Sequence, residues 1–263
     1  MRLCSIASGS SGNCIYVGTD TTHLLVDVGI SGKRIEEGLN KLSLSGRDIK
    51  GILITHEHSD HISGLGVILR KYNIPVYASY GTIMAIKDND GKIDESLLVP
   101  IDADKKVLIG DMYVHAARIP HDAREPYAYR FSDGSKKVGI MTDMGTYDDY
   151  IVESFKGMDA LLIEANHDVR MLQEGPYPYY LKQRILGNKG HLSNEASGRL
   201  LSNLLNDDMQ HILLGHLSKE NNLAELAYET VRLEIENADN EYRANDFDIK
   251  VAGRNQLSDI INI

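Results

Sequence analysis

The amino-acid sequence predicts an α/β protein in which two β-sheets pack face to face with helices outside. Two observations predict this fold class. Apolar runs of strand length fall into two groups along the chain, and segments with helical periodicity flank each group. No repeat or linker-like stretch separates the groups, and 263 residues with 42% hydrophobic content are enough for one core. We therefore expect residues 1–263 to form a single domain.

The first group of strands opens the chain. The turns between them are rich in Gly, Ser, Asn, Asp and Thr, which favour turns over strands. Strands are expected at 3–7, 14–17, 24–28, 51–54 and 76–77. Helices are expected at 33–42 and, after Gly64, at 65–69.

The second group of strands begins after residue 100. Strands are expected at 107–109, 113–118, 128–131, 138–141, 161–163 and 211–214. Asp133-Gly134 is a hairpin signal between two of them. Helices are expected at 194–205 and 223–236. The last apolar runs, 247–251 and 257–261, suit two closing strands that cover a sheet edge or join a dimer, so the oligomeric state stays open.

Composition limits the expected location and partners. The formal charge of −10 argues against a broad electrostatic contact with nucleic acid, which depends on Lys and Arg neutralising phosphates, but leaves a local contact open. Cys4 and Cys14 are too few for a disulfide scaffold and are expected to pack as small apolar residues. No secretory pattern opens the chain, and no apolar run approaches the roughly 20 residues of a membrane-spanning helix. We expect a cytoplasmic protein that contacts no membrane.

The strongest chemical signal is the run Thr55-His56-Glu57-His58-Ser59-Asp60-His61. It places three imidazoles and the Asp60 carboxylate between an apolar strand and a helix. A corner of this kind presents the side chains toward one point. Imidazole and carboxylate are ligands that Zn, Fe and Mn accept, and no thiolate nearby indicates a closed structural zinc site. The run therefore predicts a metal site.

Further candidate ligands follow other predicted strands. They are Asp27, His121, Asp143 and His216. A single Asp or His at a strand end is more often a capping or turn residue. The repetition of the pattern at several strand ends favours one shared site.

At this point the sequence resembles the metallo-β-lactamase superfamily over roughly residues 3–222, through His56-x-His58-x-Asp60-His61 and the order of the later candidates. Within that superfamily it is similar to the YycJ/WalJ branch. The segments that carry this similarity are Ser8-Gly9-Ser10-Ser11-Gly12-Asn13, Pro120-His121-Asp122-Ala123, Glu164-Ala165-Asn166-His167-Asp168 and Gly190-His191-Leu192-Ser193-Asn194. The resemblance implies an αβ/βα four-layer sandwich with two mixed sheets, and a 5′-to-3′ exonuclease that acts on double-stranded DNA.

The resemblance also implies a ligand set for two divalent ions, Zn or Mn, with Fe also acceptable to such ligands. One ion takes His56, His58 and His121, the second takes Asp60, His61 and His216, and Asp143 bridges them. Asp27 is expected to orient the histidines or the loop. Two ions about 3.5–4 Å apart can share a hydroxide and hold the attacking and leaving oxygens during in-line displacement at phosphorus. Asp60 could also orient or deprotonate the attacking water.

The segments after Asp143 are similar to a series in the tRNA 3′-processing zinc endonucleases of the superfamily. The series is Leu162-Ile163-Glu164-Ala165, Gly190-His191-Leu192-Ser193 and Gly215-His216-Leu217-Ser218. The similarity implies that Glu164 holds His191, which protonates the leaving group. His167 is harder to place, because it could contact a substrate phosphate, act as a ligand or cap a turn.

Two segments could contact a substrate. The loop 8–13, with Ser10 and Asn13, could cradle a phosphate or be a plain turn between strands. The stretch 168–189 interleaves Lys182, Arg184 and other basic residues with tyrosines. It could hold a nucleic-acid backbone and stack bases, or it could be an amphipathic surface helix after a Pro-rich turn.

The expected function is a dinuclear metal-dependent phosphodiesterase with nucleic acid, most of all double-stranded DNA, as its substrate. A small-molecule phosphodiesterase acting on cyclic nucleotides or cyclic phosphates, and an RNA-processing nuclease, stay open as alternatives. A di-iron oxidoreductase is disfavoured because such relatives typically carry Glu where this chain has His58. A non-catalytic module is disfavoured because no proposed ligand is missing.

Overall fold

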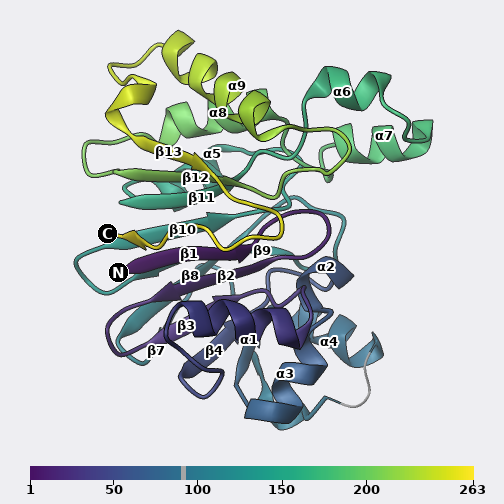
Figure 1. The fold of residues 1–263 in the computed structure, drawn as a ribbon, viewed down its shortest axis with the longest axis vertical. Helices are drawn as coiled ribbons and strands as arrows, with labels where there is room; N and C mark the ends of the chain where they lie inside the picture. Colours follow the sequence, from purple (N-terminus) through teal and green to yellow (C-terminus); the bar gives the residue numbers. More distant parts are fainter. Residues whose placement is uncertain (90–92) are drawn as a thin grey trace.

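The computed structural model describes residues 1–89 and 93–263 and contains two seven-stranded mixed sheets (Figure 1). The order of strands is β14-β1-β2-β3-β4-β5-β6 in the first sheet and β13-β12-β11-β10-β9-β8-β7 in the second. Each sheet has an antiparallel part made by hairpins and a parallel part whose strands are joined by helical crossovers. The predicted α/β sandwich of two mixed sheets is therefore confirmed.

The first sheet is formed almost entirely by the N-terminal part of the chain. Its strands are β1 (Arg2–Ala7), β2 (Cys14–Gly18), β3 (His23–Val26), β4 (Ile49–Leu53), β5 (Val76–Ala78), β6 (Leu98–Pro100) and β14 (Ile261–Asn262). The helical segments are α1 (Gly32–Lys41), α2 (Ser59–Ile62), α3 (Leu65–Tyr72), α4 (Tyr80–Asn89) and η1 (Glu95–Leu97). The pairs β3–β4 and β4–β5 are parallel, so these strands end at the same edge of the sheet.

The second sheet is formed by the C-terminal part. Its strands are β7 (Lys106–Ile109), β8 (Met112–Arg118), β9 (Tyr127–Ser132), β10 (Lys137–Met141), β11 (Ala160–Glu164), β12 (His211–Gly215) and β13 (Asp248–Val251). The helical segments are α5 (Asp149–Phe155), α6 (Val169–Glu174), α7 (Tyr179–Leu186), α8 (Asn194–Leu204), α9 (Ala224–Asn237) and η2 (Ala244–Asp246). Strands β10 to β13 run parallel.

Three layers of apolar side chains hold the sandwich together. One lies between the sheets and includes Val26, Tyr129 and Leu162. Another packs α5, α8 and α9 on the outer face of the second sheet, and a third packs α1, α3 and α4 on the first (Figure 1). Successive residues of a strand point to opposite faces, so Leu161 contacts the helices while Leu162 faces the other sheet. Both faces are covered, which explains the continuous apolar runs.

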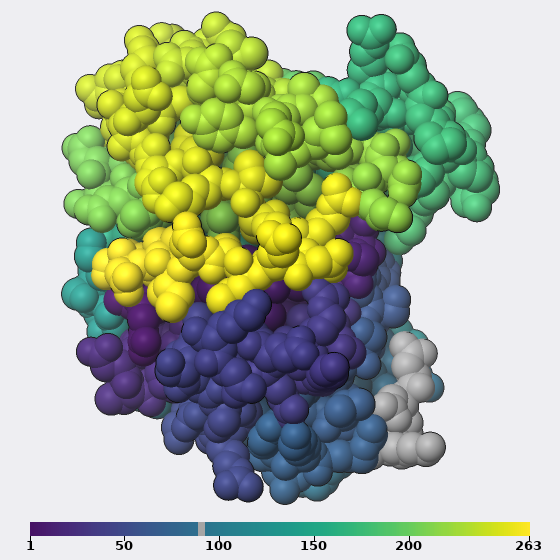
Figure 2. Space-filling view, in the orientation of Figure 1, coloured from purple at the N-terminus to yellow at the C-terminus, as the bar shows by residue number. Residues whose placement is uncertain are grey.

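The C-terminal segment connects the two sheets, because β13 is an edge strand of the second and β14 an edge strand of the first. Figure 2 shows this segment, in yellow, lying across the seam between them. The predicted strand at 257–261 is wrong for most of its length, since only Ile261–Asn262 pairs with β1. Ser258 instead donates its backbone N–H to the carbonyl of Ser5, and its Oγ accepts the Ser5 N–H.

Several elements were not predicted from the sequence, namely β6, the 3-10 helices η1 and η2, and the helices α2, α4, α5 and α6. Helices α2, α5 and α6 have 4 to 7 residues, which is too short for a clear 3.6-residue pattern, and in α4 the apolar residues Ile83 to Ile86 are consecutive instead of periodic. Helix α7 matches the surface-helix alternative for the stretch after the Pro-rich turn. In the described residues, no helix combines the length and apolar character needed to cross a membrane.

Candidate metal centre

The candidate ligands lie in loops that leave strands at one edge of the sandwich. Strand β4 leads into the His56–His61 loop, and β3, its parallel neighbour, leads to Asp27. In the second sheet, β10 and β12 run parallel on either side of β11 and lead to Asp143 and His216. Because parallel strands end at the same edge, residues far apart in the chain meet there. The structure brings all of the predicted ligands together.

Three of the strand-end residues have a left-handed backbone. The φ angles are 58° at Asp27, 60° at Asp143 and 55° at His216. This region is sparsely populated by residues other than glycine. At each of these residues the backbone turns sharply after its strand. The side chain therefore lies at the edge of the sheet.

One group of donor atoms is formed by His56, His58 and His121. Nε2 of His56 lies 3.0 Å from Nδ1 of His58, and Nε2 of His121 lies 3.3 Å from the same atom. Burial and the neighbouring histidines lower the pKa of His56 well below its usual value. Ring nitrogens that converge at this distance suit a shared cation, which would bind their lone pairs.

A second group is formed by Asp60, His61 and His216. Nε2 of His61 lies 3.4 Å from Oδ2 of Asp60, and Nε2 of His216 lies 3.7 Å from the same oxygen. Asp143 lies between the two groups, with Oδ2 3.2 Å from His61 Nε2 and Oδ1 3.8 Å from His121 Nε2. Asp143 is thus the carboxylate that both groups share.

The donor atoms fit a bound cation. Oδ2 of Asp143 and Nε2 of His216 are buried and have no hydrogen-bond partner in the described part of the chain. Burial lowers the pKa of His216, but the charge of Asp143 and the neighbouring carboxylates of Asp60 and Glu164 outweigh this effect and raise the pKa to about 10. The buried carboxylates therefore favour a positive charge at this point, and a divalent ion would supply it.

Asp27 and Thr55 orient the histidines from behind. Oδ2 of Asp27 lies 2.7 Å from Nδ1 of His61 and accepts the Thr55 hydroxyl at 2.9 Å, while Oδ1 accepts the Thr55 N–H. The Thr55 hydroxyl also lies 3.0 Å from Nδ1 of His56. These contacts leave Nε2 of both rings facing the shared space. The orienting position predicted for Asp27 matches its contacts, whereas no role for Thr55 was expected from the sequence.

Glu164 is a buried carboxylate that contacts two histidines at once. Its Oε1 lies 2.8 Å from Nδ1 of His191 and 2.8 Å from Nδ1 of His216. Its Oε2 accepts backbone N–H groups of Met144 and Leu192. The predicted contact between Glu164 and His191 is present, and its contact with His216 was missed. The His191 side chain stays 18% exposed, so the ring reaches the surface of the site.

The loop 8–13 packs against the candidate ligands. Nδ2 of Asn13 lies 3.1 Å from Nε2 of His61, and the Ser8 hydroxyl accepts the backbone N–H of His216. Gly29 lies against the same region, where an added Cβ would come 1.6 Å from the Asp60 carbonyl oxygen. Ser10 is exposed and has no hydrogen bond to these residues within the described chain. The loop therefore supports two of the candidate ligands, His216 through Ser8 and His61 through Asn13.

The remaining predicted contacts are distributed around the site. His167 is buried, its Nδ1 lies 3.3 Å from Oδ1 of Asn166, and burial lowers its pKa to about 4. Lys182 donates a hydrogen bond to the carbonyl of Gln173, which is not one of the candidate ligands. Arg184 instead forms two hydrogen bonds to Asp122, the residue after His121.

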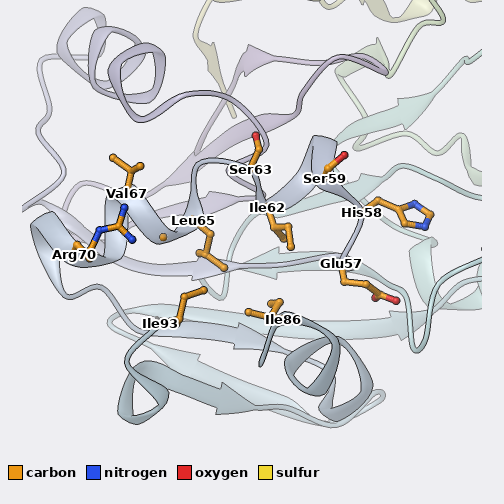
Figure 3. Close-up of a pocket in the computed structure, with 11 residues that line it drawn as sticks. Glu57, His58, Ser59, Ile62, Ser63, Leu65, Val67, Arg70, Ile86 and Ile93 are labelled. Atoms are coloured by element: carbon orange, nitrogen blue, oxygen red, sulfur yellow. The ribbon is translucent and has the colours of Figure 1, made fainter. Parts of the chain in front are cut away.

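A pocket of about 520 Å³ adjoins the metal-binding loop (Figure 3). Glu57 and His58 lie at one end and Arg70 at the other, and the His58 ring points away from the apolar residues. The apolar part of the lining is formed by Ile62, Leu65, Val67, Ile86 and Ile93. Its volume lies within the range of roughly 300–1,000 Å³ typical of small-molecule sites.

Comparisons with known proteins agree with this geometry. Residues 7–183 match the family model described as the metallo-beta-lactamase superfamily. The chain is 43% identical over 233 residues to exodeoxyribonuclease YycJ of Bacillus anthracis, covering 88% of each chain. It is also 43% identical over 236 residues to exodeoxyribonuclease WalJ of Streptococcus pneumoniae strain D39, covering 89% of this chain and 88% of that one.

Solved structures show the same fold at low identity. The metallo-beta-lactamase fold protein YhfI from Bacillus subtilis has a TM-score of 0.73 at 15% identity, with 98% of each chain covered. Zn(2+)-bound PqqB from Methylobacterium extorquens has a TM-score of 0.70 at 14% identity, with 100% of each chain covered.

Proposed function

Since the chain belongs to the metallo-β-lactamase superfamily and to its YycJ/WalJ branch, as a metal-dependent hydrolase of phosphodiester bonds, we propose that it is a 5′-to-3′ exonuclease acting on double-stranded DNA. The observation that carries the phosphodiester chemistry is the Glu164–His191 pair beside the cluster of candidate ligands, and DNA as the substrate rests on the 43% identity to the two exodeoxyribonucleases. A phosphodiester leaves as an alkoxide, which needs a proton donor, and this pair is placed to supply one.

The residues divide into two sets that would each hold a divalent ion, Zn or Mn, with Fe also acceptable to the donors. The first set is His56, His58 and His121, the second is Asp60, His61 and His216, and Asp143 would contribute to both. When bound, the ions would lower the pKa of a water molecule and neutralise negative charge on the phosphodiester.

The protein's own groups would then handle the protons. Nδ1 of His191 faces Glu164 Oε1, so the other ring nitrogen, Nε2, is left to donate a proton to the leaving oxygen. The Glu164 carboxylate favours the protonated ring, which has a raised pKa despite its burial. Asp60, with a side chain 25% exposed, is the carboxylate that would accept a proton from the attacking water.

Cleavage of end-labelled duplex DNA tests the proposal. Protein depleted of metal would be resupplied separately with Mn or Zn, and matched RNA would be tested beside the DNA. We expect metal-dependent loss of nucleotides from 5′ ends, abolished in Asp143→Ala and His58→Ala proteins that keep the wild-type circular dichroism spectrum. Full activity in either variant would contradict the proposed site, and release from 3′ ends would contradict the proposed polarity.

The pocket beside Glu57 and His58 favours one alternative, a phosphodiesterase acting on cyclic nucleotides or cyclic phosphates. A cyclic nucleotide would fit a pocket of about 520 Å³, and its phosphate would lie near His58. Turnover of cyclic nucleotides without cleavage of any duplex or single strand would favour this alternative. Cleavage of the matched RNA alone would favour an RNA-processing nuclease.

A further inference from the structure

Helix α7 is among the least buried helices of the molecule, although Leu181, Lys182 and Ile185 are partly buried. None of its residues, Tyr179–Leu186, is buried. Figures 1 and 2 show α6 and α7 projecting from the body, at the end of the sheets where α2 also lies. Most helices of globular proteins are stabilised by packing one apolar face on a core. In α7 the partly buried Leu181 and Ile185 provide only a small face of this kind, and the side that carries Tyr179, Tyr180 and Arg184 is exposed and available to a partner.

The side chains of α7 are suited to a nucleic-acid partner. Tyr179 and Tyr180 are 76% and 74% exposed, more than any other large hydrophobic side chain in the described residues. Residues 168–190 contain four basic and two acidic residues, a formal charge of +2 in a chain of −10. Exposed aromatic rings and local positive charge together are the features of surfaces that bind single strands.

Arg184 connects this helix to the candidate metal centre. Its Nε and Nη2 donate to Asp122 at 2.5 Å and 3.1 Å, and Oδ1 of Asp122 lies 3.4 Å from Nε2 of His121. The hydrogen bond to Asp122 raises the pKa of Arg184, and the charges of Asp60 and Asp143 add to this effect. The guanidinium therefore lies near the cluster, and three of its five N–H donors are left for another acceptor.

Tyr180 and Arg184 are four residues apart, so they lie on the same face of the helix. The rise of 1.5 Å per residue separates them by about 6 Å along the axis. A strand whose phosphate contacts Arg184 would therefore pass along the face that carries Tyr180.

We propose that α7 binds the DNA strand at the metal centre, with Arg184 holding a backbone phosphate and Tyr179 and Tyr180 stacking on unpaired bases. This inference rests on the proposed nuclease function. Bases inside a duplex already stack on their neighbours, so the tyrosines can contact only nucleotides outside the duplex. The helix would thus give the enzyme a preference for duplex ends that carry unpaired nucleotides.

Fluorescence anisotropy with labelled duplexes, blunt or with a single-stranded overhang, tests the role of the rings. All proteins would carry Asp143→Asn to prevent cleavage. We expect Tyr179→Ser/Tyr180→Ser to weaken binding of the overhang duplex about tenfold or more, since stacking on one ring contributes ~1–3 kcal/mol. The double Phe variant keeps the rings and should bind like the Asp143→Asn parent. Equal affinity of the Ser and Phe variants would overturn the inference.

Salt dependence tests Arg184. Arg184→Gln removes one phosphate contact and should lessen the slope of log affinity against log salt by about 0.7–0.9. Arg199→Gln is the matched control, because Arg199 is similarly exposed (56% against 52%) and is also ion-paired, with Glu234 on another helix. An Arg184 that only anchored α7 would leave the slope unchanged, and that result would contradict its assignment to phosphate.

Two further results would contradict a role of α7 in DNA binding. If sedimentation shows that the Ser variant dissociates a dimer while DNA affinity stays the same, the tyrosines join two copies of the chain and the inference is wrong. If the wild-type protein hydrolyses bis(p-nitrophenyl) phosphate but binds and cleaves no nucleic acid, the proposed function fails, and α7 loses its proposed ligand with it.

Discussion

Replacing Glu164 by Gln removes one charge but almost no volume, and we expect it to disrupt the site severely. The carboxylate accepts four hydrogen bonds. Two come at 2.8 Å from Nδ1 of His191 and Nδ1 of His216, and two come at 3.0 Å and 3.2 Å from the backbone of Met144 and Leu192. A carboxamide has one accepting oxygen, so its NH₂ group must face two of these donors.

The magnitude follows from the donors that lose their acceptor. Two buried unsatisfied donors at ~1–3 kcal/mol each lower the free energy of unfolding by about 2–6 kcal/mol. If the NH₂ group faces the rings, Nδ1 of His216 must accept a hydrogen, and its Nε2 then carries the proton and cannot bind a metal. We therefore expect metal affinity to fall by about 10–100-fold, the usual effect of removing a residue that orients a ligand.

Urea unfolding of metal-free protein measures the first effect, and titration of Zn or Mn into that protein measures the second. Glu57→Gln is a matched control, because the Glu57 carboxylate also lies in the His56–His61 loop but, among the described residues, accepts only the backbone N–H of Arg124. Its free energy of unfolding should fall by less than that of Glu164→Gln, because only one hydrogen bond to the carboxylate is affected. Wild-type metal affinity and stability in Glu164→Gln would refute the reasoning.

Three other predictions follow from the structure. The pKa of His216 is raised to about 10 in the metal-free protein. Its contribution to the free energy of unfolding is therefore complete below the pKa of the unfolded chain, near 6.5, and is lost as the pH rises toward 10. Urea unfolding of metal-free protein between pH 6 and 10 should show this decline. Burial raises the pKa of Cys4 and of Cys14, so neither thiol should react with a disulfide reagent at pH 8 until the protein unfolds, and rapid labelling of native protein would contradict this. Gly29→Ala places a Cβ against the Asp60 carbonyl oxygen and should reduce metal affinity, whereas wild-type binding in a titration would show that the loop can move aside.

Much of the fold was predictable because its signals are local. The apolar runs that became β4, β10 and β12 end at polar residues, and parallel strands place such ends along one edge. The residue types at these ends were sufficient to expect that the donor side chains converge. By contrast, the sequence left the stretch that forms α7 open between a substrate contact and a surface helix, because the helix has no fully buried residue.

The orienting contacts were harder to predict because they join residues distant in the chain. Thr55 contacts Asp27 across 28 residues, and Glu164 contacts His216 across 52. A threonine before the histidine motif gives no sign of which carboxylate it will meet. Likewise, the pairing of Arg184 with Asp122 depends on where α6 and α7, which follow β11, lie relative to the loop after β8. The periodicity of the sequence contains no information about this placement.

The left-handed backbone at Asp27, Asp143 and His216 limits the residue types that these positions tolerate. Asp, Asn and His are the non-glycine residues that enter this conformation most readily, whereas β-branched residues are strongly disfavoured. Asp and His are also residues whose side chains bind metals. The backbone bend at the strand end and metal binding at the edge of the sheet thus favour the same few residue types. Anyone who transplants this centre into another scaffold must therefore copy the bend together with the side chain.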